Sequence, residues 1–61
     1  MPHIILVRVT NVPNGGDIFE ARDKQGTFLS GFRSEQDIRH MLWRLNYTVT
    51  AELTVPYAPI V

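Results

Sequence analysis

The stretch HIILVRVT, residues 3–10, is apolar on both sides of the strand that it predicts. Its isoleucines and valines are β-branched, and such side chains fit the surface of a pleated sheet. Because alternate residues of a strand point to opposite faces, Ile4 and Leu6 share one face, whereas Ile5 and Val7 share the other. A strand with two apolar faces is typical of the interior of a sheet. We therefore expect residues 3–10 to form a central strand.

Two strands joined by a tight turn follow the loop NVPNGGD. The segments IFEAR at 18–22 and TFLSGF at 27–32 are rich in β-forming residues. Between them lies DKQG at 23–26, whose first Asp and last Gly suit a type I turn. The three segments predict a hairpin, in which we expect Phe19 and Phe28 to face a helix.

The clearest helix signal begins at Ser34, a good N-cap residue. Asp37 stands in the first turn, where the positive end of the helix dipole stabilises a carboxylate. Asn46 suits the left-handed residue that follows a helix. An apolar stripe with helical spacing predicts the buried side; it consists of Ile38, Met41, Leu42 and Leu45.

A last strand is predicted over 47–55, YTVTAELTV, where apolar and polar residues alternate. The alternation predicts one buried face, formed by Tyr47, Val49, Ala51, Leu53 and Val55. Two prolines then predict an extended tail over 56–61. The expected order is β-β-β-α-β in a single α+β domain, 1–61. It has a four-stranded, mainly antiparallel sheet in the order 3-2-1-4, with one helix packed on one face.

One helix covers only one face of such a sheet. If Ile5, Val7 and Val9 meet the helix, Ile4 and Leu6 point away from it and need another cover. One candidate cover is the tail, with Tyr57 and Ile60 folded back over the sheet. The other is a second copy of the chain or a different protein.

Composition restricts the classes of function. The chain has 61 residues, no cysteine and no net charge. The lack of cysteine excludes disulfides and thiolate metal sites, and His3 and His40 show no spacing typical of metal ligands. We expect no metal and no cofactor. Nucleic-acid binding usually needs a basic excess, and the run IILV is too short to cross a membrane. We expect a cytoplasmic protein.

Catalysis has little support in the sequence. The chain has no cysteine nucleophile and no serine in a nucleophile-elbow motif. Glu20 and Glu52 are expected on one wet face of the sheet, beside Arg8 and Arg22, as cross-strand charge neighbours. We expect a protein that is not an enzyme and has no small-molecule substrate.

Trp43 is out of phase with the apolar stripe of the helix, at about 150° from its centre. It shares the outer surface with Arg39 and His40, and Arg44 follows it. Trp and Arg are enriched among the residues that dominate protein interfaces. Two interpretations remain open: Trp43 anchors a partner, or it folds locally onto Pro56, Tyr57 or a loop.

The stretch IFEARDKQGTFLSGFRSEQDI, 18–38, resembles in its order of elements the N-terminal part of HicB-type antitoxins. The Pro-Gly-Cys element of that family and its DNA-binding extension have no counterpart here. The plan of a hairpin, a helix and a strand also resembles small phage proteins that bind and inhibit host enzymes. These resemblances imply a regulator of another molecule, in the second case one encoded by a virus.

The sequence favours a small non-enzymatic protein-binding module: an inhibitor, adaptor or regulator of another protein, with a homodimer as a second form of partnership. The alternative is a nucleic-acid-binding or antitoxin-like regulator that uses the sheet face or the arginines of the helix. The residues expected to bind a partner are Arg39, His40, Trp43 and Arg44 on the helix, and Ile4 and Leu6 on the sheet.

Overall fold

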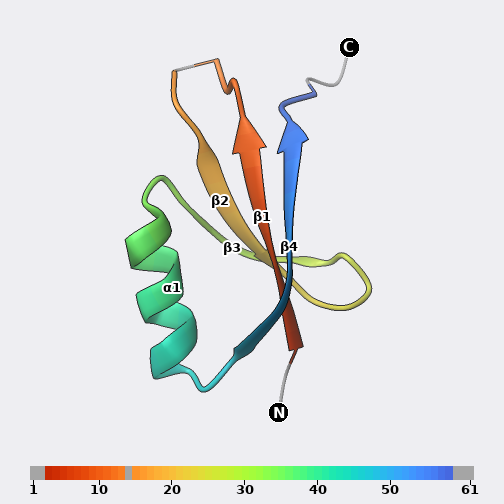
Figure 1. The fold of residues 1–61 in the computed structure, drawn as a ribbon, viewed down its shortest axis with the longest axis vertical. Helices are drawn as coiled ribbons and strands as arrows, with labels where there is room; N and C mark the ends of the chain where they lie inside the picture. The colour runs from red at the N-terminus through yellow and green to blue at the C-terminus, as the bar shows by residue number, and fades with distance from the viewer. Residues whose placement is uncertain (1–2, 14, 59–61) are drawn as a thin grey trace.

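The computed structural model describes residues 3–13 and 15–58 and has the expected order of elements (Figure 1). The strands are β1 (His3–Thr10), β2 (Ile18–Arg22), β3 (Phe28–Phe32) and β4 (Thr48–Pro56), and the helix is α1 (Glu35–Arg44). The sheet has the order β3-β2-β1-β4, in which β1 runs antiparallel to β2 and parallel to β4. The predicted topology is confirmed.

The central strand β1 has its two faces the other way round from the expectation. Ile4 and Leu6 are 1% and 3% exposed and lie in the core beneath α1, so they do not point away from the helix. The pairing with β2 explains this, because Leu6 lies opposite Ala21. The core cluster consists of Ile4, Leu6, Phe19, Ala21, Ile38 and Leu42. Residues directly opposite each other share a face, so Ile5, Val7 and Val9 face away from the helix.

In the edge strand β4, one extra residue shifts the alternation of side chains between the two faces of the sheet. Ile4 is paired with Val49, but the next residue, Ile5, is paired with Ala51, so Thr50 forms a bulge. Val49 packs against the core on the helix side. Beyond the bulge, Ala51, Leu53 and Val55 lie on the opposite face, and Glu52 and Thr54 lie on the helix side. The expected single apolar face over 47–55 is therefore wrong.

The hairpin between β2 and β3 is built by its turn. Asp23 Oδ1 accepts hydrogen bonds from the N–H groups of Gln25 and Thr27, at 3.0 and 2.8 Å, and Gly26 has φ +89°. A second irregularity lies just beyond, since Arg22 pairs with Phe28 and Ala21 with Ser30. Phe28 is 51% exposed on the side away from the helix, so the expectation that it belongs to the core is wrong.

The helix begins and ends as the sequence predicts. The N–H of Asp37 donates to Ser34 Oγ at 3.3 Å. After the last turn, Asn46 has φ 61°, and the N–H of Tyr47 donates to the carbonyl of Leu42 at 2.9 Å. This is the hydrogen-bond pattern of a Schellman motif, which satisfies the last carbonyl groups of the helix.

The predicted apolar stripe of α1 is correct except at its end. Ile38 and Leu42 are fully buried, and Met41 packs against the core. Leu45 is 55% exposed, because it caps the helix at the point where the chain turns toward β4.

The face of the sheet away from α1, here called the open face, bears side chains from all four strands. It carries Ile5, Val7, Val9, Glu20, Arg22, Phe28, Ala51, Leu53 and Val55. At one end, the N–H of Tyr57 donates to the carbonyl of Thr10 at 2.8 Å, so pairing continues past Pro56. Tyr57 does not cover Ile4 or Leu6, which α1 covers. The expected role of Ile60 lies outside the described residues.

Candidate functional site

Trp43 projects into solvent from the outer surface of α1. Trp43 is 74% exposed, so its side chain does not fold as a lid onto Pro56 or Tyr57. Its ring lies beside that of His40, with centroids 6.0 Å apart and planes inclined by 31°. The neighbouring ring lies one turn back along the helix, the spacing at which helical side chains meet. The large apolar ring is thus supported on one side and otherwise open to water.

A shallow hollow adjoins Trp43 through His40, with a volume of about 450 Å³. It is lined by Phe32, Asp37, His40, Met41, Arg44 and Leu45. The apolar members come from the end of β3 and from the helix, and the charged members lie among them. Its size is within the range of small ligand pockets, but it opens widely onto the surface. We call these six residues together with Trp43 the Trp43 surface.

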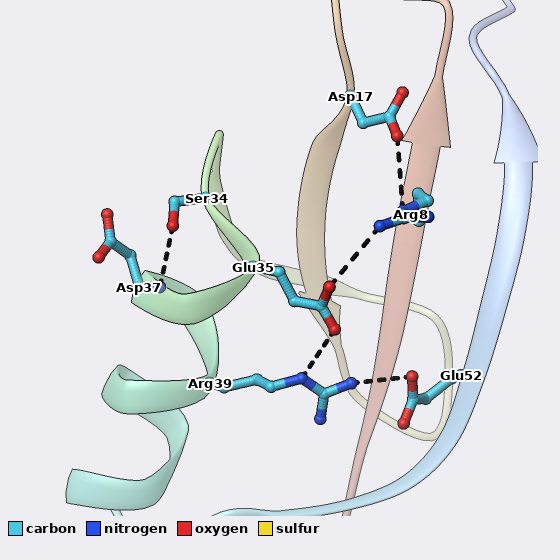
Figure 2. A network of polar contacts seen from close by, with 7 residues as sticks. All are labelled: Arg8, Asp17, Ser34, Glu35, Asp37, Arg39 and Glu52. Atoms are coloured by element: carbon cyan, nitrogen blue, oxygen red, sulfur yellow. Dashed lines mark hydrogen bonds and ion pairs between the residues drawn. The ribbon is translucent and has the colours of Figure 1, made fainter.

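Arg39 does not join this surface with its guanidinium group. Arg39 Nε lies 2.9 Å from Glu35 Oε2, and Arg39 Nη2 lies 2.9 Å from Glu52 Oε1 (Figure 2). The hydrogen bonds that Arg39 donates, to Glu35 first and to Glu52 second, raise the pKa of Arg39 above its ordinary value. The arginine therefore connects the helix to the edge strand β4 and stays fully charged.

The same carboxylates belong to a larger charge network. Arg8 lies between Asp17, at 3.5 Å, and Glu35, at 3.6 Å, as Figure 2 shows. Its guanidinium carbon also lies 5.0 Å from the centre of the Phe19 ring. Two guanidinium groups are thus surrounded by three carboxylates: Asp17, Glu35 and Glu52. The network carries both signs of charge and is not a basic cluster.

The six residues predicted to bind a partner divide into three groups. The structure brings together His40, Trp43 and Arg44 at the Trp43 surface. Arg39 is directed to the charge network. Ile4 and Leu6 are in the core and present no surface, so their assignment to a partner-binding face is wrong.

Sequence reasoning missed the apolar lining of the hollow. Leu45 continues the helical spacing, which predicts it in the core, and Phe32 lies before the helix in sequence. A signal for Leu45 was available in Asn46, since a helix that ends there leaves the residue before it at the cap.

The two glutamates expected to share one wet face lie on opposite faces. Glu20 is paired with Val7 on the open face, and Glu52 is paired with Leu6 on the helix side. The bulge at Thr50 causes the separation. Glu20 Oε1 instead lies 2.7 Å from Arg22 Nη2. Across residues 3–13 and 15–58, no three His, Asp or Glu side chains gather in a group that could hold a metal ion.

None of the helices in the described part of the chain is long and apolar enough to cross a membrane. Comparison of the chain with protein-family models, curated proteins and solved structures found no match.

Proposed function

We propose that this chain is a small non-enzymatic module that binds another protein through the Trp43 surface. The observation that carries the proposal is the 74% exposure of the only Trp in the chain. Burial of an indole ring contributes a large apolar area, and its N–H group supplies a hydrogen-bond donor. A partner that covers the exposed Trp43 ring therefore gains a large free energy of binding from the burial of that ring.

The support around the ring favours binding without large rearrangement. His40 lies against one side of the indole, and the helix that carries both residues is capped at each end. Side chains held on a rigid element lose less conformational entropy when they bind. Trp43 is therefore suited to act as an anchor residue.

The hollow beside Trp43 suggests the chemistry of the partner. Its lining includes the apolar Phe32, Met41 and Leu45, whereas Asp37 and Arg44 supply one charge of each sign. An apolar side chain of the partner fills the hollow, while polar groups around it meet the two charges. Such an arrangement of an apolar centre and a polar rim is typical of protein interfaces.

The nucleic-acid alternative has less support from the arrangement of charge. Arg8, Arg22 and Arg39 all lie within ion-pair distance of carboxylates. Phosphate binding gains from clusters of basic groups, and these three arginines are instead placed among acids. A module that works by binding protein serves as an inhibitor, adaptor or regulator. We propose the cytoplasm as its location, with a virus as one source of such proteins.

The test is capture of partners by the tagged chain, with Trp43→Ala and Tyr57→Ala examined in parallel. Tyr57 is the matched control, because it is an exposed aromatic residue far from α1 in sequence. Its hydrogen bond to Thr10 uses the backbone N–H, which the substitution keeps. A partner that binds through the Trp43 surface is retained by Tyr57→Ala and lost, or bound at least about tenfold more weakly, by Trp43→Ala.

Direct contact is then measured with the purified partner. Because the chain has one Trp, incorporation of fluorotryptophan gives a single ¹⁹F resonance. The proposal requires this resonance to shift when the partner is added. A partner that binds Trp43→Ala at full strength, or that leaves the resonance unchanged, overturns the proposal.

A further inference from the structure

The outer edge of β4 is the longest uncovered strand edge of the sheet. In the sheet order, β4 stands at one end, and within the described residues it pairs with β1 alone. Eight of its nine residues are exposed; Val49 is the exception. In Figure 1, α1 lies at the left of the view and β4 is the strand at the right, so the helix does not block this edge.

The hydrogen bonds of β4 show which of its backbone groups are free to pair. The N–H of Tyr57 donates to the carbonyl of Thr10, so the backbone groups of Tyr57 point toward β1. Because this direction alternates along a strand, the N–H and C=O groups of Thr54 and Glu52 point outward. Pro56 also points outward but has no N–H to donate.

The two edges of the sheet differ in how they are protected against pairing. The strand at the other edge, β3, has only five residues and an irregularity next to Phe28. Short length and bulges are common ways of blocking edge-to-edge association. In contrast, β4 has nine residues and a single charge, Glu52, which Arg39 binds on the helix side. On the open face of the sheet, β4 presents the exposed Leu53 and Val55.

We propose that the β4 edge pairs antiparallel with β4 of a second copy of this chain, on a two-fold axis at Leu53. In this register Glu52 lies opposite Thr54 of the other copy, and the two exchange backbone N–H···O=C bonds. The symmetry repeats the exchange on the other side of the axis. Leu53 meets its own copy between these hydrogen-bonded pairs. The product is a continuous sheet of eight strands with both helices on one face.

Neighbouring registers are less favourable, which is why the axis is placed at Leu53. An axis at Glu52 brings the two Glu52 carboxylates directly opposite each other, and like charges there are destabilising. An axis at Thr54 places Glu52 opposite Pro56, which lacks the donor that the pair needs. Glu52 and Thr54 each have both an outward N–H and an outward C=O group. Only the axis at Leu53 pairs these two residues with each other.

The strand is also complementary to itself in its side chains. On the open face, the small Ala51 lies opposite the larger Val55 of the other copy, and two Leu53 side chains meet at the centre. On the helix side, the Thr54 hydroxyl lies beside the Glu52 carboxylate. A two-fold interface requires this kind of match between a surface and itself. A second copy also removes apolar surface from water in a chain too small to bury much alone.

Single cysteines test the register, because the natural chain has none. In the proposed dimer, the two Leu53 Cα atoms form a non-hydrogen-bonded pair about 4.5 Å apart. Disulfides span about 4.4–6.8 Å between Cα atoms. Mild oxidation with copper phenanthroline is therefore expected to convert Leu53→Cys almost completely to a covalent dimer at micromolar concentration.

The matched control is Val55→Cys, which lies on the same face and strand. In the proposed register its two copies are about 13 Å apart, so covalent dimer is expected to be at least tenfold less abundant. The double variant Ala51→Cys/Val55→Cys restores the cross-link, because these positions are opposite each other. Equal cross-linking of the Leu53 and Val55 single variants contradicts the register and overturns the proposal.

Sedimentation equilibrium tests the dimer without any cross-link. The unmodified chain is expected to sediment as a dimer at tens of micromolar. Thr54→Pro removes an outward N–H that β1 does not use, so it is expected to yield a folded monomer, whereas Thr54→Ala stays dimeric. Circular dichroism checks that each variant is folded. A natural chain that remains monomeric at hundreds of micromolar overturns the proposal and leaves this edge to a strand from another protein.

Discussion

Arg39 of α1 and Glu52 of β4 form an ion pair with 2.9 Å between Nη2 and Oε1. The two residues meet because Thr50 is taken up in a bulge, so that Ala51 follows Val49 in the alternation and Glu52 lies on the helix side of the sheet. Without that bulge, the alternation through Val49 would place Glu52 on the open face, beyond the reach of the helix. The bulge at Thr50 thus determines how the edge strand is connected to α1.

The Arg39–Glu52 pair is expected to contribute little to stability. Both side chains are partly exposed, and exposed ion pairs are worth about 0.2–1 kcal/mol. We expect a double-mutant cycle of Arg39→Ala and Glu52→Ala to give a coupling energy within that range. Urea denaturation at low and high salt measures it, and the coupling should fall as salt screens the charges. A salt-independent coupling of several kcal/mol would contradict the exposed character of the pair.

Deletion of Thr50 is expected to be tolerated, although it lies inside a strand. The deletion leaves Ile4 opposite Val49 and Ile5 opposite Ala51, so every later side chain of β4 keeps its face. We expect a loss of about 1 kcal/mol or less in the free energy of unfolding.

Deletion of Thr54 is the control for this experiment. It moves Pro56 to the position of Val55, whose N–H is directed to β1, and a proline there removes a hydrogen bond of the ladder. Urea denaturation should show a clearly larger loss for this variant. Equal losses for the two deletions would show that the bulge itself is required for the fold.

Trp43→Ala and Leu42→Ala are expected to differ strongly despite their adjacent positions. Leu42 is 2% exposed, and truncation of a buried leucine costs about 2–5 kcal/mol. Trp43 lies in water, so its truncation should change the free energy of unfolding by about 0.5 kcal/mol or less. Urea denaturation followed by circular dichroism compares them without relying on Trp fluorescence. A large loss for Trp43→Ala would mean that the ring stabilises the chain itself.

Ser34→Ala is expected to destabilise the chain by about 1 kcal/mol, the usual effect of removing an N-cap. The Ser34 hydroxyl accepts the N–H of Asp37, which has no partner within the helix. Ser34→Asp keeps an acceptor and adds a charge that the helix dipole favours, so it should match the natural chain in thermal unfolding. If both variants lose the same stability, the hydroxyl acts through something other than capping.

Local chemistry was sufficient to predict the elements and their order. Ser34 and Asn46 mark the ends of the helix, and Asp23 and Gly26 build the hairpin turn. The doubly apolar segment 3–10 correctly predicted an interior strand and, with it, the sheet order. These features depend on a few neighbouring residues, which is why their pattern can be read without knowing the contacts.

The candidate site was predicted only in part. Trp43 and His40 were identified from the phase of the helix, because helical spacing separates an outer surface from a buried stripe. The hollow beside them depends on where the helix ends relative to β3, a tertiary relationship. Arg39 has the same helical phase as the outer residues, yet its long side chain reaches Glu52.

The sequence by itself determined the elements, the ends of the helix and the central position of β1, since each follows from local propensity or periodicity. The tertiary structure decided which face of each strand meets the helix. The bulge at Thr50 arises from the way β4 aligns with β1. The alternation of apolar and polar residues in the sequence shows no break there, so it does not reveal the change of face. For this reason Leu53 lies on the open face, although Val49 packs on the helix side. Ile4 and Leu6 lie in the core because the pairing of β1 with β2 sets them on the face that α1 covers.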